Sequence, residues 1–327
     1  MDKTINWGIL GLGGIAEKFA QALATVPNAK LYSVGSRSAE KAKKFAKKYN
    51  AQNSYGSYEE LATDPSVDVI YVATPHILHC ENTLMCLKNG KAVLCEKPFA
   101  MNSKEVLQMV SLAKEKNIFL MEALWTRFLP TITKTLELIA SGVIGDIIQV
   151  KSDFGVKAHY DPDKRLFNKE LGGGSLLDIG IYPVFIALLL LGEPDKISAE
   201  AKIGKTGVDE SFSAVLKYKN GELATIFSTF LASTPVETEI YGTKGYIRIN
   251  RMWHIPTYLT LVMNDGHSED IKFKYKSNGY DYEAEEVTNC LLNGQKESSV
   301  MTLDFSIKLI GLLDKLRNIC NIKYSMD

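Results

Sequence analysis

Cysteine is scarce in this sequence and shows no pattern. The 327 residues include five cysteines, an odd number, and no Cys-x-x-Cys pair. Scattered cysteines of this kind argue against a disulfide framework or a zinc site, and they fit a reducing compartment. A surplus of charge is also absent, because 38 Lys and Arg residues balance 38 Asp and Glu residues. Nucleic acids and anionic membranes attract basic proteins, so we expect neither as a partner.

Long hydrophobic runs are missing too. The N-terminal segment MDKTINWGIL enters a strand without the apolar core of a signal peptide. The most apolar run, IYPVFIALLLLG at 181–192, is about half as long as a bilayer-spanning helix and contains Pro183. We therefore expect a core helix there and a soluble, cytoplasmic protein.

The first third of the chain alternates apolar, β-branched runs with helical patterns. Near-continuous apolar strands separated by helices indicate a parallel sheet that is covered on both faces. The pattern predicts a doubly wound α/β domain, a Rossmann domain, over residues 1–123. The expected strands lie at 6–13, 29–36, 67–74, 92–97 and 118–124, and the clearest helices at about 15–25 and 39–49.

The pattern changes after Arg127. A glycine hinge and a long apolar helix at 171–192 are followed by strands joined through turn dipeptides such as Asn220-Gly221. Strands linked in this way indicate an open, mainly antiparallel sheet. Residues 124–327 are therefore expected to form an α+β domain, whose open sheet could face a partner subunit. Its other expected helices lie at 131–141, 283–292 and 303–319.

A glycine motif stands where the first strand meets the first helix. Gly11, Gly13 and Ala16 form a G-x-G-x-x-A, with Gly14 and Ile15 between them. In this context Gly11 permits a tight turn, Gly13 lets the backbone approach a pyrophosphate, and Ala16 allows close helix packing. The alternative is a tight strand–helix turn without a ligand, since short glycine motifs recur by chance. The context favours a dinucleotide site.

The end of the second strand indicates which dinucleotide is bound. NAD sites usually carry Asp or Glu there, but this chain has Ser36, Arg37 and Ser38, with Lys41 one turn further on. An arginine, hydroxyl groups and an ammonium suit a 2′-phosphate. The alternative assigns Arg37 and Lys41 to a solvated basic helix. We expect NADP, with NAD as the weaker ligand.

The third predicted strand ends at the sheet edge where the glycine loop begins. Thr74, Pro75, His76 and His79 follow the third strand, at the carboxyl edge where doubly wound folds bind ligands. Two histidines three residues apart suit a metal, but no partner cluster accompanies them. We expect no metal and assign these histidines to the nicotinamide side of the cofactor site.

The next strand ends on Glu96, Lys97 and Pro98. Charges at a strand end are ordinary surface features, but a lysine at this edge is also a candidate for catalysis. In the second domain Asp178 and Tyr182 lie four apart in an apolar helix, so they share one face. A buried carboxylate needs a partner, and Lys97 is the one we predict for Asp178. A nearby ammonium lowers the pKa of a phenol, which makes Tyr182 a candidate proton acceptor. Tyr182 as an ordinary core residue remains the alternative.

These segments together resemble a known family. GLGGIA, ATPHILH, CEKP and GGSLLDIGIY occur in the order and spacing of the Gfo/Idh/MocA oxidoreductases, over essentially the whole chain. LMEALWTRFLP and LLDIGIY are more similar to the dihydrodiol dehydrogenase/D-xylose dehydrogenase (NADP) subgroup. The resemblance implies a catalytic Lys97, Tyr182 as the acid/base group, a 2′-phosphate contact at Arg37, and homodimers formed through the open sheet. It also implies substrate contacts at Trp125, Arg127, Phe154 and Trp253.

The resulting hypothesis is an NADP(H)-dependent dehydrogenase acting on a sugar or vicinal diol. A reductase of keto-sugars or dicarbonyls uses the same groups in the opposite direction. A non-catalytic NADP-binding regulator is the alternative of another class, and the presence of both Lys97 and Tyr182 argues against it. Glu96 either orients Lys97 or contacts the cofactor. The identity of the substrate depends on loops such as 157–170, whose course the sequence does not determine.

Overall fold

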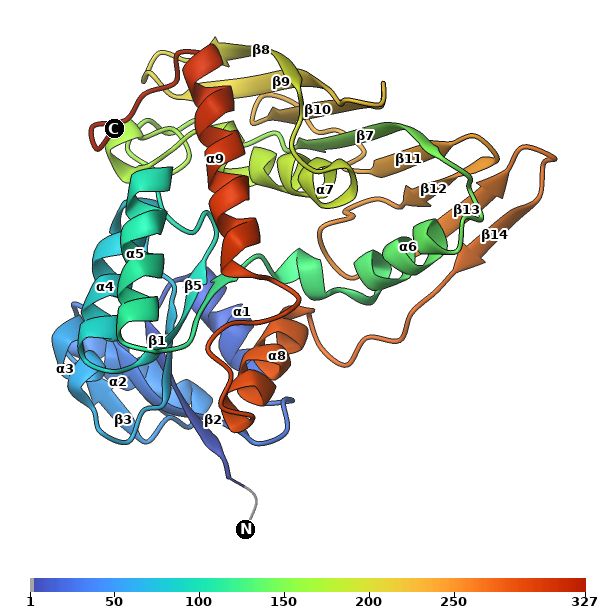
Figure 1. The fold of residues 1–327 in the computed structure, drawn as a ribbon. Helices are drawn as coiled ribbons and strands as arrows, with labels where there is room; N and C mark the ends of the chain where they lie inside the picture. The colour runs from blue at the N-terminus through green and yellow to red at the C-terminus, as the bar shows by residue number, and fades with distance from the viewer. Residues whose placement is uncertain (1–2) are drawn as a thin grey trace. The chain divides into compact units, whose positions relative to one another are not determined.

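The computed structural model describes residues 3–327, which form two compact units (Figure 1). The first comprises the residues up to Phe128 together with Tyr275–Ile307, and the second comprises Leu129–Lys274 together with Lys308–Asp327. This division differs from the predicted split at residue 123, because the segment Tyr275–Ile307 belongs to the first unit. Its helix α8 (Tyr280–Leu292) packs against α1 and β1.

The first unit is built on a parallel sheet of six strands in the order β3-β2-β1-β4-β5-β6. This is the strand order of a doubly wound Rossmann domain, and it confirms the predicted fold class. The strands are β1 (Ile5–Leu10), β2 (Ala29–Gly35), β3 (Asn53–Tyr55), β4 (Val69–Val72), β5 (Ala92–Glu96) and β6 (Leu120–Ala123). The helices are α1 (Gly14–Leu23), α2 (Ala39–Tyr49), α3 (Tyr58–Thr63), α4 (His79–Lys88), α5 (Ser103–Glu115) and α8, with 3₁₀ turns η1 (His76–Leu78) and η2 (Trp125–Phe128).

The strand register brings the ends of four strands to one edge. Leu10 at the end of β1 is paired with Gly35 of β2 and Val72 of β4, and Val72 is paired with Cys95 of β5. All these strands are parallel, so their carboxyl ends share an edge. The glycine loop, the Ser-Arg-Ser segment, the histidine segment and the Glu-Lys-Pro turn therefore all start from the edge predicted to bind the cofactor.

The second unit is built on an eight-stranded sheet in the order β14-β13-β12-β11-β7-β10-β9-β8. Every neighbouring pair is antiparallel except β7 and β10, so the predicted mainly antiparallel sheet is confirmed. The predicted turn at Asn220-Gly221 joins β9 to β10, with Gly221 at a φ of 102°. The strands are β7 (Ile147–Gly155), β8 (Lys196–Ile203), β9 (Asp209–Lys217), β10 (Leu223–Thr229), β11 (Thr238–Gly242), β12 (Gly245–Ile249), β13 (Leu259–Met263) and β14 (Ser268–Ile271).

The predicted core helix packs against this sheet. It consists of a 3₁₀ turn η3 (Lys169–Leu171), a π-helical turn η4 (Leu176–Gly180) and α7 (Ile181–Leu191), and α7 contacts β7 and β10. The stretch 169–191 is long and apolar enough to cross a membrane by length and composition, but 83% of its most apolar window is buried inside the fold, as in a core helix. The remaining helices are α6 (Pro130–Ala140) and α9 (Leu303–Ile319).

Candidate active site

The glycine loop presents the open end of α1. Gly11 has a φ of 91°, and a Cβ there would lie 2.9 Å from the carbonyl oxygen of Ala73, so only glycine fits. Gly13 caps α1 without any side-chain hydrogen bond, and no atom lies within 4 Å of the Cβ positions of Gly13 or Gly14. The first N–H groups of the helix are thus unobstructed. These features fit the pyrophosphate of a dinucleotide.

The Ser-Arg-Ser segment after β2 is ordered by its own hydroxyl groups. The Ser36 hydroxyl oxygen accepts a hydrogen bond from the Ser38 N–H at 3.2 Å, and the Ser38 hydroxyl oxygen accepts one from the Lys41 N–H at 3.3 Å. Both hydroxyl hydrogens remain as donors. Arg37 is exposed and makes no ion pair with any residue in the described range 3–327. The segment therefore offers a cation and hydroxyl donors to an anion.

The two histidines that follow β4 differ in their surroundings. His79 is fully buried, and its ring nitrogens lie 2.7 Å from the Pro98 carbonyl oxygen and 2.9 Å from the Thr74 carbonyl oxygen. His76 packs edge-on against His79, with ring centroids 5.6 Å apart. His79 thus connects the histidine segment to the Glu-Lys-Pro turn. Contact of either histidine with the nicotinamide stays a prediction.

The Glu96 carboxylate is held by two hydrogen bonds, one from a side chain and one from the backbone of Lys97. The buried Glu96 carboxylate accepts a hydrogen bond from the Tyr71 hydroxyl and another, at 3.2 Å, from the backbone N–H of Lys97. Tyr71 is itself fully buried and stacks on Phe19 at 3.8 Å between centroids. These contacts tie Glu96 to the start of the lysine turn, and its role in orienting Lys97 or in contacting the cofactor stays a prediction.

Glu122 holds the other side of this turn, and the sequence analysis did not single it out. It lies on β6 opposite Cys95, and its carboxylate accepts a hydrogen bond from the Phe99 N–H at 3.0 Å. Burial raises the pKa of Glu122 to about 7, the negative charge of Glu96 adds to the rise, and the positive charge of Lys97 opposes it. The charge of Glu122 therefore changes near neutral pH.

Replacement of this carboxyl group is expected to alter stability in a pH-dependent way. A carboxyl group whose folded pKa exceeds its ordinary value of 4.5 binds its proton more tightly in the folded state, so the wild type loses stability as pH rises from about 4.5 to 7. Glu122→Gln does not titrate. The free energy of unfolding of Glu122→Gln relative to wild type should rise across this window by about 2–3 kcal/mol. Urea unfolding of both proteins at pH 4.5 and pH 8 measures it, and an equal difference at both pH values would contradict the prediction.

Asp178 has a partner within its own unit. Arg165 donates from both terminal nitrogens to the two Asp178 carboxylate oxygens, at 2.9 and 3.3 Å. A fork-to-carboxylate pair of this kind is strong and directional. Arg165 lies in the loop whose course the sequence did not determine, so sequence reasoning missed it. A pairing of Asp178 with Lys97, which belongs to the other unit, stays a prediction.

Tyr182 lies in a buried aromatic cluster, which we define as Phe154, Tyr182, Trp253 and His254. Its ring centroid is 5.6 Å from Phe154, 5.2 Å from His254 and 6.4 Å from Trp253. The structure thus brings together three predicted site residues from β7, α7 and the turn after β12. His254 is the member that sequence reasoning missed, because a turn residue has no periodicity to mark it. The rings around the phenol could enclose a small ligand, and a positive charge would be needed to favour the phenolate in such a buried site.

The start of the helical segment that carries Asp178 and Tyr182 is fixed by Asp209. Its carboxylate accepts hydrogen bonds from the Leu176 N–H at 2.6 Å and the Ser175 hydroxyl at 2.9 Å. Gly174 has a φ of 125°, and a Cβ there would lie 2.2 Å from Asp209 Oδ1. The π-helical turn that follows contains Asp178, and such turns often occur at functional sites.

The two remaining predicted substrate contacts belong to the first unit. Trp125 is buried and stacks on Tyr280 of α8, with centroids 4.2 Å apart and planes 7° apart. Arg127 is half-buried in the same 3₁₀ turn. Their contact with a substrate stays a prediction.

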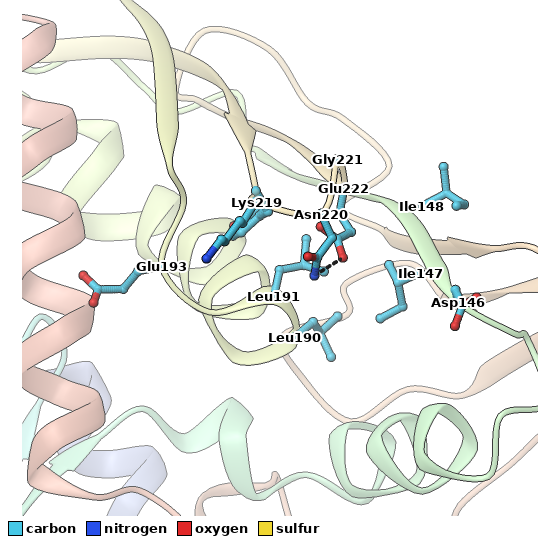
Figure 2. Close-up of a pocket in the computed structure, with 11 residues that line it drawn as sticks. Asp146, Ile147, Ile148, Leu190, Leu191, Glu193, Lys219, Asn220, Gly221 and Glu222 are labelled. Carbon is cyan, nitrogen blue, oxygen red and sulfur yellow. Dashed lines mark hydrogen bonds between the residues drawn. The ribbon is translucent and has the colours of Figure 1, made fainter.

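A separate pocket of about 700 Å³ lies in the second unit, between the end of α7 and the β9–β10 turn (Figure 2). Leu190 and Leu191 contribute apolar surface, and Asn220 donates a hydrogen bond to Glu222 at 3.3 Å. None of the predicted site residues lines this pocket. It is therefore distinct from the aromatic cluster around Tyr182.

A Rossmann unit with an open glycine loop and a second unit with a buried tyrosine in an aromatic cluster are the parts expected of an oxidoreductase that uses a nicotinamide dinucleotide. Comparison with known proteins agrees. The oxidoreductase family with an NAD-binding Rossmann fold matches residues 5–124, and the GFO/IDH/MocA C-terminal domain matches residues 132–248. The chain belongs to the GFO/IDH/MocA oxidoreductase family, as its motifs predicted.

Individual relatives are similar over their full length. Trans-1,2-dihydrobenzene-1,2-diol dehydrogenase of Xenopus tropicalis is 41% identical, over 98% of this chain and 99% of the relative, and that of Homo sapiens is 37% identical over 99% of each. Among solved structures, the 3-ketoreductase KijD10 of Actinomadura kijaniata, in complex with NADP and TDP-benzene, has a TM-score of 0.87 at 25% identity, over 97% of this chain and 98% of its own.

Proposed function

We propose that this protein is an NADP(H)-dependent dehydrogenase that transfers hydride between the nicotinamide and a hydroxyl-bearing carbon of a vicinal diol or sugar. The observation that carries the proposal is the 41% identity, over 98% of the chain, to a dehydrogenase named for a trans-1,2-diol. The aromatic cluster supports it, since aromatic faces suit the C–H surface of a carbocyclic diol or a pyranose. Assay of NADP reduction with a panel of diols and sugars tests it.

We propose that side chains of this protein transfer the proton of the substrate hydroxyl group. When bound, the nicotinamide supplies the hydride acceptor or donor. Tyr182 takes the hydroxyl proton during oxidation and returns it during reduction. Lys97 supplies a positive charge that favours the phenolate, and Glu96 and Glu122 hold the turn that carries it. Asp178, fixed by Arg165, anchors the helix one turn before Tyr182.

The direction of the reaction has two candidates. In the reverse direction, the same groups would reduce a keto-sugar or a dicarbonyl. The similarity to a 3-ketoreductase favours this direction. A non-catalytic NADP-binding regulator is the candidate of another class. The chain's Lys97 and Tyr182 count against it, since a sensor needs neither. Turnover with any substrate separates an enzyme from a sensor.

Within the cofactor site we propose that NADP(H) binds more tightly than NAD(H). The exposed Arg37 guanidinium and the hydroxyl groups of Ser36 and Ser38 would hold the 2′-phosphate, with Lys41 one turn further along. A carboxylate at Arg37 would instead repel that phosphate and accept hydrogen bonds from a 2′-hydroxyl group.

Arg37→Asp is therefore expected to weaken NADP binding by roughly ten- to a hundredfold, since it removes a charge-assisted contact to phosphate. NAD binding should change little. Dissociation constants for both cofactors measure this, with Lys43→Asp on the exposed side of α2 as the matched charge control. Equal weakening of NADP and NAD by Arg37→Asp would refute the 2′-phosphate assignment.

We also propose a homodimer formed through the open face of the eight-stranded sheet. Val215 and Leu223 are 43% and 37% exposed on this face, although a monomer needs to bury only the other side of the sheet. Glu239 lies on β11. Its carboxylate pairs with Lys151 at 3.2 Å and with Arg248 at 3.0 Å. The face thus combines exposed apolar side chains with ion pairs around Glu239, and we propose that it contacts a second copy.

Small-angle scattering at micromolar concentration is expected to give twice the chain mass of 36.3 kDa. Val215→Asp should convert the dimer into a monomer, because it places a charge in the proposed apolar contact. Leu107→Asp, on the exposed face of α5, is the control and should leave the dimer intact. A monomeric wild type would sink the proposal.

We also propose that the protein is located in the cytoplasm. The five cysteines are free thiols and four of them are buried. This supports a reducing compartment, where disulfides are rare. Subcellular fractionation with an antibody tests it.

A further inference from the structure

His254 is a polar ring inside the aromatic cluster. Its ring centroid lies 4.3 Å from Phe154 and 5.2 Å from Tyr182, and only 8% of the residue is exposed. Two side chains of this cluster can both donate and accept hydrogen bonds at neutral pH: the phenol of Tyr182 and the imidazole of His254. The buried imidazole thus lies next to the phenol proposed as the proton acceptor.

The turn that carries His254 is fixed against the sheet. Trp253 is fully buried; its indole N–H donates to the Asp153 carbonyl oxygen at 3.3 Å, and its backbone N–H donates to the Val236 carbonyl oxygen at 3.2 Å. The Ile255 N–H closes the turn on the Met252 carbonyl oxygen at 2.9 Å. The backbone on both sides of His254 is thus pinned. A ligand bound beside Tyr182 would therefore meet the imidazole at a preorganised position, which would lower the entropic cost of binding.

The chemistry of a diol calls for a second polar group at this position. If Tyr182 binds the hydroxyl group that is oxidised, the hydroxyl on the adjacent carbon lies one carbon–carbon bond away, within a cluster otherwise made of Phe154 and Trp253. A hydroxyl group buried there without a hydrogen-bond partner would cost binding energy. The imidazole of His254 contacts both Tyr182 and Phe154 and so borders that space.

We propose that His254 is the residue that recognises the second hydroxyl group of a vicinal diol and so sets the preference of the site for diols over simple alcohols. The inference rests on the proposed function, because it takes Tyr182 as the group that binds the reacting hydroxyl. It assigns His254 to substrate recognition and not to the proton transfer.

The test compares two probes that differ by one hydroxyl group, trans-cyclohexane-1,2-diol and cyclohexanol. His254→Phe preserves the ring and its packing but removes both nitrogens. It should lower kcat/KM for the diol on the order of ten- to a hundredfold and change kcat/KM for cyclohexanol by less than about threefold. His254→Gln, whose amide can still donate and accept, should restore part of the diol preference. The affinity for NADP should be unchanged in both variants.

His267→Phe, at an exposed histidine in the turn between β13 and β14, is the matched control and should leave the preference as in wild type. A purely structural role for His254 would lower activity toward both probes equally, and that result overturns the inference. A wild type that oxidises pyranoses but shows no preference for the diol over cyclohexanol also overturns it, while the proposed function stands. Absence of turnover with every diol and sugar removes the proposed function and this inference together.

Discussion

Tyr182→Phe is expected to lower kcat on the order of a hundredfold or more with the best substrate, because general acid–base catalysis contributes two to four orders of magnitude. The substitution removes one hydroxyl group and preserves the ring that packs against Phe154, Trp253 and His254. The fold and NADP affinity should therefore survive. Steady-state rates, circular dichroism and cofactor titration of the variant measure these three properties.

Tyr58→Phe is the matched control, since this tyrosine lies half-buried at the start of α3 in the first unit. It should turn over at the wild-type rate. Near-normal kcat for Tyr182→Phe would show that the proton transfer belongs to another group, with Asp178 and His79 as the next candidates.

Lys97→Met is expected to depress turnover by a similar factor while it keeps the length of the side chain. Without the ammonium the phenol returns toward its ordinary pKa of about 10, so less phenolate is present at neutral pH. In the wild type, oxidation should speed up as pH rises through the pKa of the coupled Tyr182–Lys97 group. In Lys97→Met that rise should move to higher pH.

The double variant separates a shared role from two independent ones. If both residues serve one proton transfer, the loss in Tyr182→Phe/Lys97→Met should be about that of the worse single variant. Losses that multiply would contradict a common step. An unchanged pH profile in Lys97→Met would show that the lysine acts elsewhere, for example on the cofactor.

The fold was largely predictable because its signals are local. Buried parallel strands such as 67–74 are continuous apolar runs, and the glycine loop occurs between a strand and a helix, where its meaning is specific. The assignment of α8 was not predictable in this way. An amphipathic helix shows that one face is buried but does not show which sheet buries it, and here Trp7 of β1 donates to Thr288 of that helix.

The site residues that belong to sequence motifs could be predicted, but those contributed by loops could not. Tyr182 and Asp178 stand out as polar residues in an apolar helix. Arg165 lies in a loop whose course depends on tertiary packing, so its pairing with Asp178 left no pattern in the sequence. No motif marks Glu122 in the sequence, and only the structure shows that it is buried and accepts a hydrogen bond from the Phe99 N–H.

The most direct test of the central claim is the absorbance of reduced nicotinamide when the wild-type protein is mixed with NADP and a panel of vicinal diols and pyranoses. The account predicts steady NADPH formation with at least one of them, faster than with NAD, and on the order of a hundredfold slower in Tyr182→Phe. NADP binding without turnover of any diol or sugar, and without NADPH oxidation by the matching ketones, would contradict the account and favour a cofactor-sensing regulator.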